Sequence, residues 1–365
     1  MFLVHMATNL KNLFIIFVMH QILAIHYCPG ICCSAQNVSA VFIFGDSLVD
    51  VGNNYYVNTL AMPTFPNGID FVHGAPSGRY TNARTVTDII EEELGFKNFT
   101  PPYLNPNTTG DVVLKGVNYA SSGSGILNST GAVFGAPICM DEQINNFAKT
   151  RQYIISRIGD PAAKGLFTQA LYFVAIGAND IFSGEAFTSA NDSYLDHLMS
   201  KFKAQLTGLY DLDARKIIVT NAPMVGCTPF ERDLHSSGDG CVDFLNELAK
   251  LYNIRLKSLL RELTTNLSGS TFVYLDTYAM SENILQNYRS YGFENAEIAC
   301  CQAVGQHGGL VPCGSFSRVC PDRTKYVFWD PFHPTDSVNL IMAKFVLDGD
   351  LNYVSPMNIR QLVNS

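Results

Sequence analysis

The chain has 365 residues, of which 47% are hydrophobic and 15% charged, a composition typical of a folded globular protein and not of a disordered one. Its formal net charge is −8, and its 24 lysines and arginines are scattered along the sequence. We therefore expect no nucleic-acid partner, because phosphate recognition needs clustered basic residues. No linker-like segment divides the sequence, and α/β folds of this length commonly form one domain. We expect a single domain over residues 36–365.

The N-terminus has the layout of a secretory signal peptide. An apolar run from Leu13 to Ile25 follows the weak positive flank of Lys11, and small residues suited to signal-peptidase cleavage come next. A transmembrane anchor is the alternative, but the run is shorter than the roughly 20 residues that span a bilayer. We expect residues 1–35 to be cleaved after Ala35, which predicts a secreted, extracellular protein with no stable membrane span.

Seven cysteines follow the predicted cleavage site, so up to three disulfides and one free thiol are possible. Four of them lie within residues 300–320, a stretch dense in glycine and proline that suits disulfide bonding in an oxidising compartment. A zinc site is the alternative, but no Cys-x-x-Cys pair occurs there, so we expect no metal. The seven are Cys139, Cys227, Cys241, Cys300, Cys301, Cys313 and Cys320.

Six Asn-x-Ser/Thr sequons also favour a secreted protein. Single sequons arise by chance, but six behind a signal peptide predict that several carry glycans. They fall at Asn37, Asn98, Asn107, Asn128, Asn191 and Asn266.

Short β-branched runs alternate with amphipathic segments along the chain, which predicts an α/β fold. Strands are expected over 41–44, 112–119, 171–176, 216–220 and 271–275, and helices over 84–94, from near 141 to 158, over 242–263 and over 336–346. This alternation implies a parallel sheet covered on both faces. Ligands of such sheets bind beyond the carboxyl ends of the strands. The polar clusters at 45–47, 118–125 and 177–180 should therefore gather at one edge.

A serine suited to nucleophilic attack stands at the first of these strand ends. In Phe42-Ile-Phe-Gly-Asp-Ser-Leu48, a hydrophobic strand breaks at Gly45 and exposes Ser47. A serine hydroxyl attacks a carbonyl only when a base accepts its proton and a turn presents it. The alternative is an ordinary turn, since Gly, Asp and Ser all favour turns.

The candidate base is His333, in Asp330-Pro-Phe-His-Pro-Thr335. Asp330 lies three residues before it, so in a turn the carboxylate can meet one imidazole nitrogen while the other faces Ser47. A lone histidine before a helix is more often a cap or surface residue. None of the other histidines after the predicted cleavage site has a comparable aspartate in a turn bounded by prolines.

Two further clusters could supply donors to an oxyanion. Gly123, in Gly116-Val-Asn-Tyr-Ala-Ser-Ser-Gly123, lets the backbone approach a ligand and aim its N–H inward. Asn179, in Gly177-Ala-Asn-Asp180, could donate through its side-chain amide, a contact worth about 10²–10³ in rate. Viewed alone, the first is equally a flexible Ser/Gly loop and the second an Asx turn.

Together these four motifs resemble the four blocks of the SGNH, or GDSL, hydrolase family, and their extended forms look like its plant GDSL esterase/lipase branch. The similarity spans roughly residues 40 to 350. It implies a flavodoxin-like three-layer sandwich with a five-stranded parallel sheet, in agreement with the five predicted strands. It also implies Ser47 as nucleophile, His333 as base, Asp330 as its orienting carboxylate, and an oxyanion hole formed by Ser47, Gly123 and Asn179.

Three positions depart from that branch: Ser122 and Ser124 stand where it often has Gly and Ala, and Met224 replaces a common Pro. The serines are expected to alter loop flexibility beside Gly123, without affecting the proton-transfer roles. The sequence contains no Gly-x-Ser-x-Gly elbow, His-Glu-x-x-His helix, phosphate-binding loop or dinucleotide fingerprint, so we expect no cofactor.

The resulting hypothesis is a secreted serine carboxylic ester hydrolase that acts through an acyl-enzyme on a small-molecule or lipid ester. Two alternatives stay open. The same acyl-enzyme could pass its acyl group to an alcohol, which would make the protein an acyltransferase, or the fold could be kept in a catalytically silent secreted binding glycoprotein. The acyl and alcohol groups, the disulfide pairing and the oligomeric state are not specified by the sequence.

Overall fold

Five short apolar segments form the centre of the structure, a computed structural model that describes residues 38–72, 77–182, 191–236 and 240–365. They pair as parallel strands in the order β2-β1-β3-β4-β5, and β8 adds antiparallel to β5. The parallel order 2-1-3-4-5 is that of flavodoxin-like folds. A separate ribbon joins β6 and β7. The strands are β1 Val41–Gly45, β2 Gly116–Asn118, β3 Leu171–Ala175, β4 Lys216–Thr220, β5 Thr271–Leu275, β6 Cys301–Gln302, β7 Arg318–Val319 and β8 Val354–Ser355.

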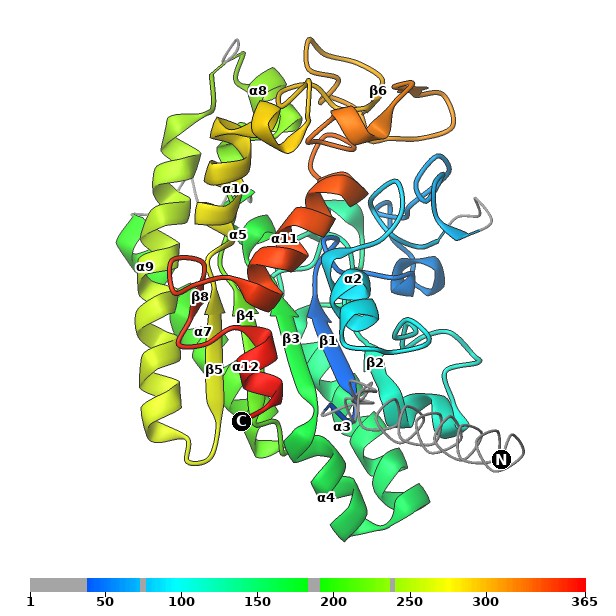
Figure 1. Ribbon diagram of the computed structural model, residues 1–365, viewed down its shortest axis with the longest axis vertical. Helices are drawn as coiled ribbons and strands as arrows, with labels where there is room; N and C mark the ends of the chain where they lie inside the picture. Colours follow the sequence, from blue (N-terminus) through cyan, green and yellow to red (C-terminus); the bar gives the residue numbers. More distant parts are fainter. Residues whose placement is uncertain (1–37, 73–76, 183–190, 237–239) are drawn as a thin grey trace, which may run out of the picture. The chain divides into compact units, whose positions relative to one another are not determined.

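Helices cover both faces of this sheet, which gives the three layers expected from the sequence (Figure 1). Alternate strand residues supply the two cores, because successive side chains point to opposite faces. One core packs against α3, α4, α7 and α9, and the other against α2, α11 and α12. The helices are α2 Val86–Glu93, α3 Met140–Ile158, α4 Asp160–Gln169, α5 Ala178–Phe182, α7 Asn191–Asp211, α8 Pro229–Leu234, α9 Asp243–Asn266, α10 Thr277–Gln286, α11 Asp336–Asp348 and α12 Ile359–Val363.

One expected strand differs from the structure. The strand expected over 112–119 begins only at Gly116, and a 3-10 helix occupies Gly110–Lys115. Gly116 has φ 122°, and a Cβ there would lie 1.9 Å from the Val41 carbonyl oxygen, so this glycine lets β2 approach β1 closely. The helix expected to begin near Asp141 begins at Met140, with Cys139 as N-cap. Thr335 caps α11 as expected, accepting a hydrogen bond from the Val338 N–H.

Three disulfides join six of the seven cysteines described, and Cys139 is free. They link Cys227 to Cys241, Cys300 to Cys320 and Cys301 to Cys313. The structure thus reaches the maximum of three bridges and one free thiol that the seven cysteines allow. Sequons at Asn98, Asn107, Asn128 and Asn266 are exposed, Asn191 begins α7, and the predicted signal peptide and Asn37 lie outside the described residues. Among the described helices, none combines the length and apolar character needed to cross a bilayer.

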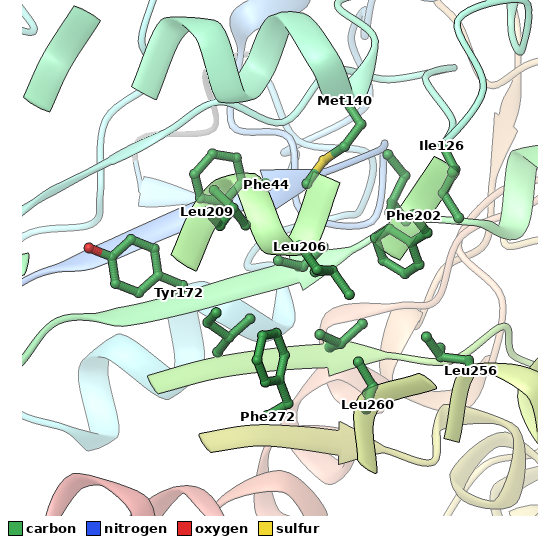
Figure 2. Close-up of a cluster of buried hydrophobic side chains, with 14 of the residues drawn as sticks. Phe44, Ile126, Met140, Tyr172, Phe202, Leu206, Leu209, Leu256, Leu260 and Phe272 are labelled. Carbon is green, nitrogen blue, oxygen red and sulfur yellow. The ribbon is translucent and has the colours of Figure 1, made fainter. Parts of the chain in front are cut away.

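Aromatic rings form the centre of the larger core, part of which is shown in Figure 2. Phe147 of α3 is fully buried, and its ring contacts those of Phe42, Phe44 and Tyr172 on the sheet, with centroids 5.0 to 5.7 Å apart. Such a ring holds helix and sheet together through apolar burial and edge-to-face contacts.

Phe147→Ala should therefore lower the free energy of unfolding by roughly 3–5 kcal/mol, because it leaves a cavity that these rings cannot close. Urea unfolding followed by circular dichroism measures this loss. Phe244→Ala, which truncates a half-exposed ring on α9, is the control and should change stability by less than about 0.5 kcal/mol. Equal effects of the two substitutions would contradict the assignment of Phe147 to the core.

A buried carboxyl group in α2 makes stability depend on pH. Burial raises the pKa of Glu91 to about 8, although hydrogen bonds from the Thr100 N–H and hydroxyl favour its ionised form. The folded protein therefore keeps a proton that the unfolded chain releases above its ordinary pKa of 4.5. Because the folded state binds more protons in this window, stability falls as pH rises from about 4.5 to 8.

Glu91→Gln cannot ionise, and its oxygen can accept the Thr100 N–H while its NH₂ group donates to the Thr100 hydroxyl. Its stability relative to the wild type should therefore increase as pH rises through this window. Unfolding free energies measured across it give the difference, in which the other titrating groups cancel. Glu93→Gln, at an exposed position of the same helix, should leave the pH dependence unchanged. Parallel curves for Glu91→Gln and wild type would show that Glu91 ionises normally.

Candidate active site

Ser47 lies in a turn at the carboxyl end of β1. Gly45 has φ 152°, and a Cβ there would lie 2.2 Å from the Ala175 carbonyl oxygen, so only glycine allows the chain to turn this close to β3. The Gln143 side chain accepts from the Gly45 N–H and donates to the Gly45 carbonyl, both at 2.8 Å. The Asp50 N–H donates to the Asp46 carbonyl at 3.0 Å and closes the turn. The serine is thus presented by a rigid backbone.

The His333 imidazole bridges Ser47 and Asp330. Its Nε2 is 2.7 Å from Ser47 Oγ, and its Nδ1 is 2.8 Å from both carboxylate oxygens of Asp330. An ionised carboxylate only accepts hydrogen bonds, so Nδ1 carries the ring proton and Nε2 is free to accept the serine proton. The Asp330 carboxylate also accepts the N–H groups of Phe332 and His333 at 2.8 Å, which fixes its orientation.

The cysteine-rich segment, residues 300–320, supports the turn that carries Asp330 and His333. The Trp329 N–H donates to the His333 carbonyl at 2.8 Å, and the Cys301 N–H donates to the Trp329 carbonyl at 2.6 Å. The fully buried Trp329 indole packs among the four cysteines of the 300–320 segment and donates to Asn67 at 2.8 Å. Two disulfides therefore support the backbone that carries Asp330 and His333.

The expected oxyanion donors face the same cavity as the serine and histidine. Its volume is about 930 Å³, and Ser47, Gly123, Asn179 and His333 all line it. Asn179 Nδ2 donates one hydrogen bond, to the Ser124 carbonyl at 2.9 Å. An amide NH₂ has two protons, so the second is available to a ligand. Gly123 has φ 82°, a backbone conformation that a side chain would strain.

The segment around Gly123 is held by a hydrogen-bond network, which contrasts with the flexible loop considered from the sequence. Asp50 accepts the Ser122 N–H at 3.0 Å, and Asn54 Nδ2 donates to the Ser122 carbonyl at 3.0 Å. Ser124, one of the departures noted above, is fully buried and donates to the Gly45 and Ser121 carbonyls. The Ser124 hydroxyl therefore helps to fix the loop, whereas Ser122 takes part through its backbone.

Several residues of this network were not identified from the sequence as site residues. Asn53 joins the loops through the carbonyls of Asn118 and Ala120, and Asp180 accepts the N–H groups of Ile126 and Leu127. Asp50, Asn53 and Asn54 follow the Ser47 motif closely and Asp180 ends the Gly177–Asp180 motif, but their spacing does not indicate their hydrogen-bond partners. Whether a polar side chain near a strand end becomes buried, and which backbone group it then meets, depends on the tertiary structure.

Burial changes the acidity of the carboxyl groups around Ser47. It raises the pKa of Asp46 to about 7 and that of Asp50 and Asp180 to about 6, partly offset by hydrogen bonds from backbone N–H groups. The Tyr80 ring lies 5.1 Å from the His333 ring, and its hydroxyl donates to the Ala61 carbonyl at 2.7 Å. Within the described ranges, no group of three or more His, Cys, Asp or Glu side chains is arranged to hold a metal ion.

Comparison with known proteins finds relatives that extend over most of the chain. Residues 41–346 match the family model described as GDSL-like Lipase/Acylhydrolase. Two Arabidopsis thaliana proteins described as GDSL esterase/lipases are 49% and 43% identical. The first alignment covers 94% of this chain and 96% of the relative, and the second covers 89% and 88%.

Among solved structures, a catalytic mutant of an acetylxylan esterase from Geobacillus stearothermophilus aligns with a TM-score of 0.39 and 15% identity, over 84% of this chain and 91% of that one. The family model and the two relatives extend over most of the chain, including all four motifs. The chain belongs to the GDSL-like lipase/acylhydrolase family.

Proposed function

We propose that the protein is a serine carboxylic ester hydrolase whose nucleophile is Ser47, with His333 as base and Asp330 as the carboxylate that orients it. The observation that carries the proposal is the continuous hydrogen-bonded path from Ser47 Oγ to His333 Nε2 and from Nδ1 to Asp330. These contacts, at 2.7 and 2.8 Å, are within the range needed for proton transfer. Relatives described as esterase/lipases agree with this reaction class.

The reaction would proceed in two halves. The Ser47 oxygen forms a bond to the ester carbonyl carbon while His333 Nε2 accepts the hydroxyl proton. The tetrahedral intermediate collapses, the bond to the leaving oxygen breaks, and His333 returns the proton to the departing alcohol. In the second half, His333 takes a proton from water, the water oxygen attacks the acyl-enzyme, and the carboxylic acid leaves as Ser47 regains its proton.

Charge on the carbonyl oxygen would be stabilised by the N–H groups of Ser47 and Gly123 and by the free amide proton of Asn179. Their value lies in their fixed position, since donors already aimed at the developing oxyanion need no reorganisation in the transition state. The carboxylate of Asp330 stabilises the imidazolium that forms when His333 accepts the proton.

We also propose that residues 36–365 form one secreted hydrolase domain, released after cleavage of residues 1–35. Three disulfides suit an oxidising compartment, and four exposed sequons would be accessible to glycosylation. The substrate is a small-molecule ester with an apolar portion, because apolar side chains such as Leu48, Phe182 and Phe332 line the cavity beside the serine.

Ser47→Ala should lower the turnover of p-nitrophenyl butyrate by several orders of magnitude, because the remaining groups can no longer form an acyl-enzyme. It should also abolish labelling by a fluorophosphonate probe. Ser258→Ala, at an exposed position on α9, is the control and should retain wild-type activity. Undiminished turnover or labelling in the Ser47 variant would overturn the assignment of the nucleophile.

Asn179→Ala should reduce kcat by about 10²–10³ and leave KM nearly unchanged, since its amide is proposed to bind the oxygen only once charge develops. The variant also loses the hydrogen bond to Ser124, so its thermal unfolding should be measured alongside the kinetics. An increase in KM at constant kcat would show instead that Asn179 binds the ground state of the ester.

A further inference from the structure

Three segments that line part of the cavity contain no charged side chain other than histidine. Asp, Glu, Lys and Arg make up 15% of the chain, yet none of them occurs in residues 51–69, 116–140 or 298–317. Each segment contributes to the cavity wall: the first through Leu60 and Met62, the second through Val133 and Phe134, and the third through Pro312 and Cys313. The one histidine within them, His307, is buried against Asp233.

Large apolar side chains of these segments are exposed to solvent. The exposed fraction is 83% for Leu60, 80% for Val133 and 73% for Phe316, which are among the highest values for large apolar residues in the described part of the chain. Leu60 and Val133 also line the cavity, so their exposure places them at its opening. Met62, Phe65 and Leu310, each about half exposed, extend the same kind of surface.

The three segments are joined to one another. The Leu60 N–H donates to the Phe134 carbonyl at 2.7 Å, and Thr59 forms a β-bridge with Gly135. Gly314 of the third segment lies beside Thr64 of the first, since a Cβ added to this glycine would lie 3.7 Å from Thr64 Oγ1. We call the exposed apolar side chains of these joined segments the apolar rim; they are Leu60, Met62, Phe65, Val133, Leu310 and Phe316.

We propose that the apolar rim adsorbs to the surface of an uncharged lipid phase and that the enzyme takes its ester from that surface. This inference rests on the proposed ester hydrolysis. Exposed apolar side chains gain free energy on leaving water, and contiguous patches of them mark interaction sites. Since Leu60 and Val133 of the rim also line the cavity that contains Ser47, a lipid in contact with them would have access to the nucleophile.

The charge pattern specifies the kind of surface. Adsorption to anionic lipid relies on clustered lysine and arginine, which the three segments lack. The net charge of −8 would repel an anionic surface further. A neutral ester lipid imposes no such repulsion, and it is itself a substrate of the reaction proposed here. If a second copy of the chain covered the rim instead, it would block access of an ester to the cavity, so we favour a lipid surface.

The test measures adsorption separately from catalysis. Triolein droplets coated with phosphatidylcholine are mixed with the Ser47→Ala protein, floated by centrifugation, and the bound fraction is determined. The expected result is that the protein floats with these droplets and not with phosphatidylglycerol vesicles. Phe316→Glu, added to this protein, should reduce the partition coefficient by about tenfold or more, because one large apolar side chain is replaced by a charge.

Ile254→Glu is the matched control. It makes the same kind of change at a residue with 64% exposure on α9, away from the cavity wall, and should leave partitioning unchanged. Equal partitioning of the Phe316 and Ile254 variants, or stronger binding to the anionic vesicles, would overturn the inference. So would a rim-dependent dimer in sedimentation velocity without droplet binding.

Hydrolysis of dissolved p-nitrophenyl butyrate distinguishes this inference from the proposed function. Phe316 is not part of the cavity wall, so Phe316→Glu in the otherwise wild-type protein should retain this activity and lose hydrolysis of emulsified triolein or tributyrin. Activity on the dissolved ester without flotation would refute adsorption through the rim and leave the proposed hydrolysis intact. Flotation without activity on any ester would refute the proposed hydrolysis and leave adsorption as a property of the rim.

Discussion

The hydrogen bond between Ser47 and His333 joins side chains 286 residues apart in the sequence, and it can form only if two independent turns are held at the same edge of the sheet. One turn leaves β1 and is fixed by Gly45 and Gln143. The other is fixed by Asp330 and rests on the disulfide-bonded segment behind Trp329. A displacement of either turn by about 1 Å would lengthen this bond beyond useful proton transfer. The buried polar side chains around these turns hydrogen-bond to the loop backbone and oppose such a displacement.

That polar interior has an energetic cost. Asp46, Asp50 and Asp180 are buried carboxyl groups whose desolvation raises their pKa, and one oxygen of Asp46 has no hydrogen-bond partner among the described residues. Asp50 and Asp180 recover part of this cost because each accepts hydrogen bonds from several loop N–H groups. The gain is a loop backbone held in one conformation, which the proposed oxyanion donors would need in order to stabilise charge without reorganisation.

The residues next to Ser47 and the loops farther along the cavity wall differ in polarity. Close to Ser47, buried carboxyl groups and amides fix the backbone, whereas the loops farther out lack lysine, arginine, aspartate and glutamate and expose apolar side chains. An ester has a polar centre and an apolar remainder, so a site with fixed donors at its base and an apolar rim matches both parts.

The sequence by itself determined β1, β3, β4 and β5, because strands buried on both faces are written as continuous apolar runs. It also identified the two turns with Ser47 and His333, since glycine, proline and aspartate encode turns locally. It missed β8, which is two residues long and exists only through its pairing with β5, and it misread 112–115, where glycines bracket a 3-10 helix. The disulfide pairing and the partners of Asp50, Asn53 and Asp180 were decided by the tertiary structure alone. Those contacts join segments far apart in the chain, and no local pattern records which distant backbone group a polar side chain will meet.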